Sequence, residues 1–119
     1  MAIVDDEPAI YSKDVADRYG IKGFFFHSMK EGRRFVELRL LQTGGVISEL
    51  QRQVAFKLST VAPSGVLVHI GEYRADFTYR DQKGRFVVED VKGPARREDL
   101  YLWKRRHVQA QYGITIIEV

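Results

Sequence analysis

The sequence predicts a mixed α/β domain with helices on the faces of its sheet. Three observations support this class: a helix-periodic segment that begins with a capping motif, two strand-like segments joined by a tight turn, and a strand–helix–strand ending. Strands joined by a turn run antiparallel, whereas strands joined through a helix run parallel. The expected order is therefore α-β-β-β-α-β, an α+β arrangement around a mixed sheet with flanking helices.

The first main helix is predicted to begin at Ser28. Ser28 and Glu31 have the spacing of a capping box, in which each residue satisfies a backbone donor of the other. Phe35 and Leu38 follow at helical intervals and mark the apolar face. The Thr-Gly-Gly sequence at 43–45 is expected to end this helix.

Three strands are predicted next. Residues 52–59 alternate between polar and apolar side chains, as a half-buried strand does. Residues 73–79 and 85–91 form two further candidates, and the turn-forming residues 81–84 between them predict a hairpin. The apolar segment 66–70 is left without an assigned role.

The C-terminal part is predicted to form a helix and a strand. Gly93 and Pro94 interrupt the preceding strand, and acidic residues near position 98 favour a helix start there. This helix is expected to continue to Gly113 and to place Trp103 in the core rather than on a base-stacking surface. Residues 114–119 form the closing strand.

Length and composition place the whole chain, residues 1–119, in a single domain. Its 119 residues are 45% hydrophobic, which is enough for one core. Residues 1–11 are expected to form a loose N-terminal arm. No apolar run is long enough for a membrane span, and the absence of cysteine excludes disulfides and thiolate chemistry. Any metal site would have to use hard oxygen ligands.

The positive charge is concentrated in one segment. Residues 92–107 carry a formal charge of +4, more than the +3 of the entire chain. Such a surface suits a polyanion such as nucleic acid, although a solvated helix face has the same composition. The basic residues of this segment are Lys92, Arg96, Arg97, Lys104, Arg105 and Arg106.

Acidic and basic side chains converge at the end of the predicted hairpin. Asp90 and Lys92 share one face of the third strand, and Asp76 lies on the strand before it, with Ala75 and Phe77 expected to point the other way. Adjacent carboxylates repel unless a cation lies between them, and Mg²⁺ is the natural candidate. Lys92 would offset charge on a phosphate. The simpler alternative is an Asp90–Lys92 ion pair with Asp76 in a turn.

Glu89 takes the opposite face of the same strand. It is therefore expected to pair with a Lys or Arg of a covering helix rather than to join the acidic site. His69 and His107 are interpreted as structural residues.

The sequences Ala75-Asp76-Phe77 and Val87-Val88-Glu89-Asp90-Val91-Lys92-Gly93 resemble the active-site motif of the PD-(D/E)xK nuclease superfamily. The chain is also similar to small phage and prophage proteins of that superfamily, some of which are regarded as resolvase-like. Ala75 stands where the motif has Pro, and His27 stands where we expect Asp. The similarity covers most of the chain and includes residues 26–31, 38–47 and 51–54, Tyr101 and Lys104.

This resemblance implies a restriction-endonuclease-like core and a site for Mg²⁺, with Mn²⁺ as a substitute. Asp76 and Asp90 would be metal ligands, and Lys92 would position the attacking water. Glu31 would act as a third ligand, directly or through water, or serve only as a helix cap.

The expected function is a metal-dependent endonuclease that cuts DNA, with structured or branched DNA as the narrower expectation. It would act in the cytoplasm of a bacterial host, in phage replication or recombination. DNA and a second copy of the chain are the expected partners, without a membrane or a small-molecule cofactor. The alternatives are a catalytically silent nucleic-acid-binding module and a phage accessory interaction protein. The DNA backbone would be held by Arg96, Arg97, Lys104, Arg105 and Arg106.

Overall fold

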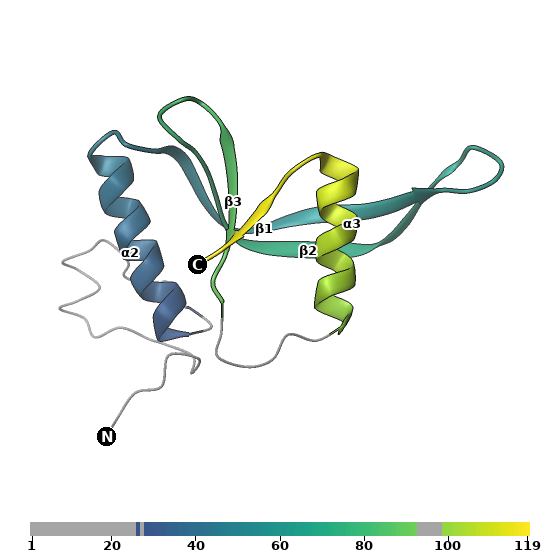
Figure 1. Cartoon of the computed structure of the whole chain (residues 1–119), viewed down its shortest axis with the longest axis horizontal. Helices are drawn as coiled ribbons and strands as arrows, with labels where there is room; N and C mark the ends of the chain where they lie inside the picture. The colour runs from purple at the N-terminus through teal and green to yellow at the C-terminus, as the bar shows by residue number, and fades with distance from the viewer. Residues whose placement is uncertain (1–25, 27, 93–98) are drawn as a thin grey trace, which may run out of the picture.

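The structure is a computed structural model that describes residues 26, 28–92 and 99–119. Its element order confirms the predicted one, and the long β1–β2 ribbon crosses behind the shorter strands (Figure 1). Predictions for the N-terminal arm, for His27 and for residues 93–98 concern positions outside these described residues. The elements are α2 (Met29–Thr43), β1 (Ser48–Val61), β2 (Leu67–Arg80), β3 (Phe86–Asp90), α3 (Asp99–Tyr112) and β4 (Ile116–Glu118).

The sheet is mixed, as the sequence predicts. Its strands lie in the order β1-β2-β3-β4. The pairs β1–β2 and β2–β3 are antiparallel, whereas β3 and β4 run parallel because α3 returns the chain to the same end of the sheet.

Helix α2 begins as the capping motif predicts. The Ser28 backbone is extended, and its Oγ accepts a hydrogen bond of 3.1 Å from the Glu31 backbone N–H. At the other end, Gly44 donates to the Leu40 carbonyl at 3.0 Å. Phe35 and Leu38 are buried, so the predicted apolar face is the one that packs.

Two hydrophobic clusters hold the helices on opposite faces of β3. Val87 packs against the cluster under α2, and its neighbour Val88 belongs to the cluster under α3. The α2 cluster contains Phe26, Phe35, Leu38, Ile47, Phe77 and Tyr79. The α3 cluster contains Phe56, Leu58, Tyr73, Ala75, Val88, Val108 and Ile116.

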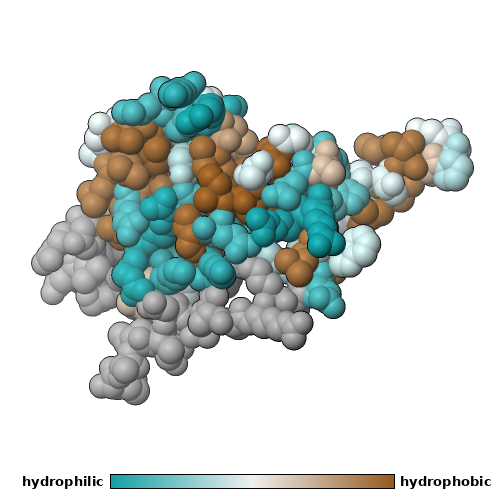
Figure 2. Space-filling view, viewed as in Figure 1, coloured by the Kyte–Doolittle hydropathy of each residue, from teal (hydrophilic) through white to brown (hydrophobic). Residues whose placement is uncertain are grey.

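The β1–β2 ribbon is longer than the sequence predicts. The apolar segment 66–70, which had no assigned role, lies largely in β2, and the Ala62 N–H donates to the Val66 carbonyl at 2.8 Å to close the turn. The ribbon projects well past α3 (Figure 1), and hydrophobic residues lie along it, with more polar residues at its tip (Figure 2). We refer to residues 60–70 as the β-arm.

The β2–β3 turn forms as predicted. The Asp81 carboxylate accepts hydrogen bonds of 2.9 Å from the backbone N–H groups of Lys83 and Arg85, and its second oxygen contacts Arg85 Nε at 2.7 Å. These bonds, the one from the Arg85 backbone foremost, hold the pKa of Asp81 below its usual value. Gly84 completes the turn with a φ of 77°, a region that glycine adopts readily.

The prediction that Trp103 lies in the core is wrong, because its side chain is 70% exposed. Helix α3 turns Tyr101 and Val108 toward the sheet, and these positions share one helical face. Trp103 is two residues from Tyr101 and therefore projects from a different face.

Candidate functional site

Asp76 and Asp90 lie on neighbouring strands where the β2–β3 ladder gives way to side-chain bonds. The regular pairs run from Arg80↔Phe86 to Phe77↔Glu89. One position further, the Asp76 N–H donates to Asp90 Oδ1 at 3.1 Å, and the Val91 N–H donates to Asp76 Oδ2 at 2.8 Å. The two carboxylates are therefore held by the backbone of the opposite strand, which confirms that they converge.

Glu31 reaches the same region from the first turn of α2. Its side chain is only 3% exposed, and its Oε1 accepts a hydrogen bond of 3.2 Å from Gln53 Nε2. Arg52 Nη2 lies 3.7 Å from the same oxygen. The Glu31 carboxylate is thus directed at β1, beyond what its helix-capping position requires.

Gln53 connects Glu31 to Asp76 and was not predicted as a site residue. Its Nε2 also donates to Asp76 Oδ1 at 3.2 Å, so one amide group spans both carboxylates. Its backbone φ is 53°, an uncommon value for a non-glycine residue. A glutamine in an alternating strand carries no signal of either property, because alternation assigns it to the solvent face.

The expectation that Ala75 and Phe77 share a face is wrong. Ala75 belongs to the α3 cluster, whereas Phe77 belongs to the α2 cluster. The paired strand β1 changes in the same place, since Arg52 lies over the Phe26 ring of the α2 cluster and Val54 packs against the α3 cluster. The ribbon therefore exchanges its faces at Gln53 and Asp76.

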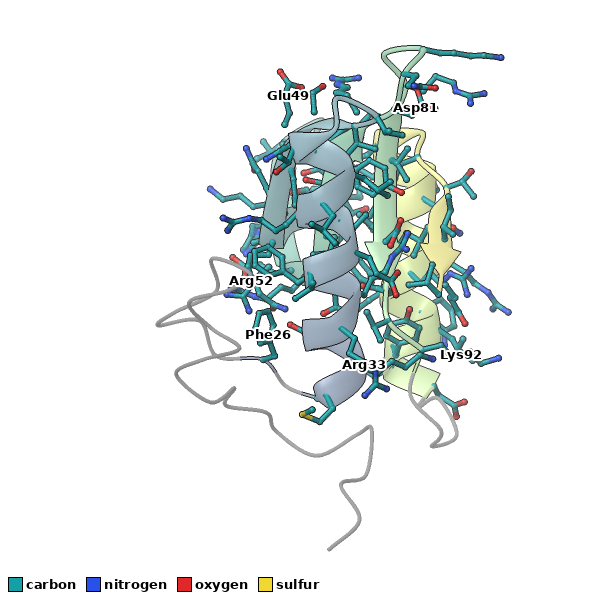
Figure 3. All side chains as sticks on the ribbon, turned by 90° about the vertical axis from the view of Figure 1, so that its left-hand side faces the viewer. Phe26, Arg33, Glu49, Arg52, Asp81 and Lys92 are labelled. Carbon is teal, nitrogen blue, oxygen red and sulfur yellow. The ribbon has the colours of Figure 1, made fainter. Side chains whose placement is uncertain are left out.

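Asp90 and Lys92 lie where β3 ends. Asp90 is 5% exposed, and Tyr101 of α3 donates its hydroxyl to Asp90 Oδ2 at 3.0 Å. The Lys92 side chain is exposed, and the Lys92 backbone makes two hydrogen bonds. Its N–H donates to the Val119 carbonyl at 2.7 Å, and its carbonyl accepts from Lys30 Nζ at 2.6 Å. Figure 3 shows Arg52 and Lys92 near the end of the molecule where α2 begins, away from Glu49 and Asp81.

Glu89 pairs with a basic residue of the covering helix, as predicted. Arg34 of α2 donates to both of its carboxylate oxygens at 2.8 Å, and the Tyr79 hydroxyl donates to Oε2. The hydrogen bond to Glu89 raises the pKa of Arg34, and burial followed by the Glu89 carboxylate raises the pKa of Tyr79 to about 12. Glu89 is thereby separate from the acidic site.

The predicted DNA-binding residues lie in different environments. Lys104 lines a cleft of about 420 Å³ beside Tyr101, and Arg106 is exposed. Arg105 is engaged within the fold, since it bonds Glu118 Oε1 at 2.5 Å and the Ile116 carbonyl at 3.3 Å. Arg96 and Arg97 fall outside the described residues.

The donor chemistry of the site fits a hard cation. Glu31, Asp76 and Asp90 offer carboxylate oxygens, the ligands that Mg²⁺ and Mn²⁺ prefer. Within residues 26, 28–92 and 99–119, no three His, Cys, Asp or Glu side chains already form a metal-binding group. The Gln53 amide lies between two of these carboxylates and hydrogen-bonds both.

A family model described as "Protein of unknown function (DUF1064)" matches residues 11–115. The chain belongs to this family. The DUF1064 match includes every residue of the acidic site together with Lys92 and Tyr101. No curated protein and no solved structure matches the chain. Neither helix of the described segments is long and apolar enough to cross a membrane.

Proposed function

We propose that this protein is a metal-dependent endonuclease that hydrolyses DNA phosphodiester bonds, within the PD-(D/E)xK superfamily that its motifs resemble. The observation that carries the proposal is the meeting of three carboxylates from three elements. Glu31 of α2, Asp76 of β2 and Asp90 of β3 are linked through Gln53 and through backbone hydrogen bonds. Grouping acidic side chains at buried and half-buried positions costs free energy unless they are protonated, paired with a positive side chain or bound to a metal cation.

Each residue has a distinct role in this proposal. Asp76, Asp90 and Glu31 hold Mg²⁺ or Mn²⁺, and a bound metal supplies polarisation of the scissile phosphate and a lowered pKa of water. Lys92, two residues after Asp90, offsets negative charge as the phosphate is attacked. Tyr101 orients Asp90 through the hydroxyl bond of 3.0 Å.

DNA is the substrate that the charge distribution favours. Lys92 follows β3 directly, and Lys104 lines the cleft beside Tyr101, the residue that bonds Asp90. Arg106 is exposed on the same helix as Lys104. Contacts from such residues to the DNA backbone carry little sequence information. We therefore propose recognition of DNA shape, with branched DNA as the substrate and phage recombination in a bacterial cytoplasm as the setting.

Cleavage assays with labelled linear, single-stranded and four-way DNA test this function. Wild-type protein is expected to cut in Mg²⁺ and to be inactive in EDTA. Asp90→Asn keeps the shape of the side chain and removes its charge. We therefore expect cutting to be slower by at least about a hundredfold, the usual rate loss when one group that stabilises charge in the transition state is removed. Glu37→Gln, a change of an exposed acid on α2, serves as the control and should cut at the wild-type rate.

Wild-type cutting that resists EDTA, or an Asp90→Asn variant as fast as wild type, would contradict the proposal. One observation favours the alternative of a silent nucleic-acid-binding module, namely that an amide separates Glu31 from Asp76. DNA binding at low salt without cleavage of any substrate would establish that alternative.

A further inference from the structure

Gln53 combines a polar contact and a backbone conformation that an ordinary strand residue lacks. Its Nε2 lies 3.2 Å from Glu31 Oε1 and 3.2 Å from Asp76 Oδ1. Its φ of 53° places it in the left-handed region, where a non-glycine side chain is disfavoured and persists only when its surroundings require it. The residue is half-buried at the point where β1 exchanges its faces.

The chemistry of the two neighbours determines which end of the amide faces them. Ionised carboxylates only accept hydrogen bonds, so the amide must present its NH₂ group and not its oxygen. This neutral donor lies between two negative groups and offsets part of their repulsion without supplying a charge. A cation at this position would require the reverse orientation, with the carbonyl oxygen turned inward.

We propose that Gln53 is the positioning residue of the metal site, which rests on the proposed function above. In the metal-free protein its NH₂ group bridges Glu31 and Asp76. A divalent cation held by these carboxylates would require the amide to turn over, so that Oε1 replaces the NH₂ group facing them. The positive φ of Gln53 coincides with its contact to both carboxylates.

Binding of Mn²⁺, followed through the electron paramagnetic resonance signal of the free ion, tests this role without any DNA. We expect Gln53→Ala to weaken Mn²⁺ binding by about tenfold, the lower range for residues that orient metal ligands. Gln51→Ala removes an exposed glutamine from the same strand and should bind as wild type. Gln53→Gly accepts the positive φ without strain and provides a second variant if the alanine form fails to fold.

Gln53→Glu separates a metal-directed role from a purely structural one. It restores an oxygen donor but adds a negative charge beside Glu31 and Asp76. The metal-free variant should therefore melt below wild type, and Mn²⁺ should raise its melting temperature by more than it raises that of wild type. A structural role alone would lower the melting temperature and leave the Mn²⁺-induced increase unchanged.

Equal Mn²⁺ affinity in wild type, Gln53→Ala and Gln53→Gly would overturn the role of Gln53. This result leaves the nuclease proposal standing if wild type still cuts DNA. Mn²⁺ affinity that is the same in wild type and Asp90→Asn would place the ion elsewhere and overturn both. Mn²⁺ binding that depends on Gln53, with no cleavage of DNA, would support the positioning role and refute the nuclease.

Discussion

Glu89 shows how one side chain is kept out of the acidic site. Its carboxylate is 1% exposed, and it is neutralised by Arg34 and hydrogen-bonded by Tyr79 on the α2 face of the sheet. Its neighbour Asp90 turns to the other face and meets Asp76. Alternation along a strand predicted this division correctly, because β3 is regular up to the last residue of the ladder.

Tyr79 and Tyr73 differ in whether the buried hydroxyl group is hydrogen-bonded, and this difference gives a prediction for two single substitutions. Tyr79→Phe removes a hydroxyl that bonds buried Glu89, so we expect a loss of about 2 kcal/mol in the free energy of unfolding at neutral pH. The Tyr73 hydroxyl is buried and has no hydrogen-bond partner among the residues that the structure describes, so Tyr73→Phe should be neutral or stabilising. Urea unfolding at pH 7.5, within the ~5–8 range of usual maximal stability, measures both, and a larger loss in Tyr73→Phe would contradict the assignment.

The raised pKa of Tyr79 makes the free energy of unfolding depend on pH in the alkaline range. The folded protein keeps this proton up to about pH 12, while an unfolded tyrosine loses it near pH 10. The folded state therefore binds more protons in this window, and stability contributed by Tyr79 is complete below pH 10 and is lost as the pH rises toward 12. The Tyr79→Phe variant should show a shallower alkaline loss than wild type.

At the scale of elements, the sheet is joined to α2 by charge as well as by apolar contact. Arg34 of α2 joins the helix to Glu89 through two hydrogen bonds of 2.8 Å. We expect Arg34→Ala to cost roughly 3 kcal/mol of unfolding free energy, because it leaves a buried charge without its partner. Arg106→Ala on α3, at an exposed position, should cost less than about 0.5 kcal/mol. Thermal and urea unfolding compare the two, and equal losses would show that Glu89 is satisfied without Arg34.

Element boundaries and contacts were predicted unevenly. The cap of α2, the 81–84 turn and the parallel β3–β4 pair follow from short-range signals, and all three are confirmed. The exchange of the two faces of the ribbon at Gln53 was not predicted, because an alternating pattern of polar and apolar residues does not indicate which residue has a positive φ. Trp103 was misplaced because an aromatic residue at a helical interval predicts burial only if that face meets the sheet.

At the scale of the whole molecule, the β-arm gathers several exposed apolar residues in one segment. Helix α3 covers the base of the ribbon, where His107 and Tyr112 bond the carbonyls of Ser59 and Lys57 at 2.9 and 2.7 Å; His107 is thus structural, as predicted. Beyond this point, residues 60–70 contain no Asp, Glu, Lys or Arg. Exposed apolar residues of the arm are Val61, Val66, Leu67, Val68 and Ile70.

We propose that the β-arm joins two copies of this chain. An uncharged surface suits self-association, because two identical charged surfaces would repel, and outer strands offer unpaired backbone groups to a second copy. Leu67, 68% exposed, is the position to test. Sedimentation should find wild type as a dimer and Leu67→Glu as a monomer. Leu40→Glu changes an exposed leucine of α2, 59% exposed, and should remain dimeric. A wild-type monomer at high concentration would refute this assembly.

The sequence by itself determined the order of elements, the helix cap, the hairpin turn and the meeting of Asp76 with Asp90. These depend on periodicity and on residues close in the chain, so local chemistry is sufficient to predict them. Only the tertiary structure decided that Gln53 links Glu31 to Asp76, that Arg105 is occupied by Glu118 and that residues 60–70 project as an arm. Each of these depends on contacts between distant segments or on one backbone angle, which the pattern of polar and apolar residues does not encode.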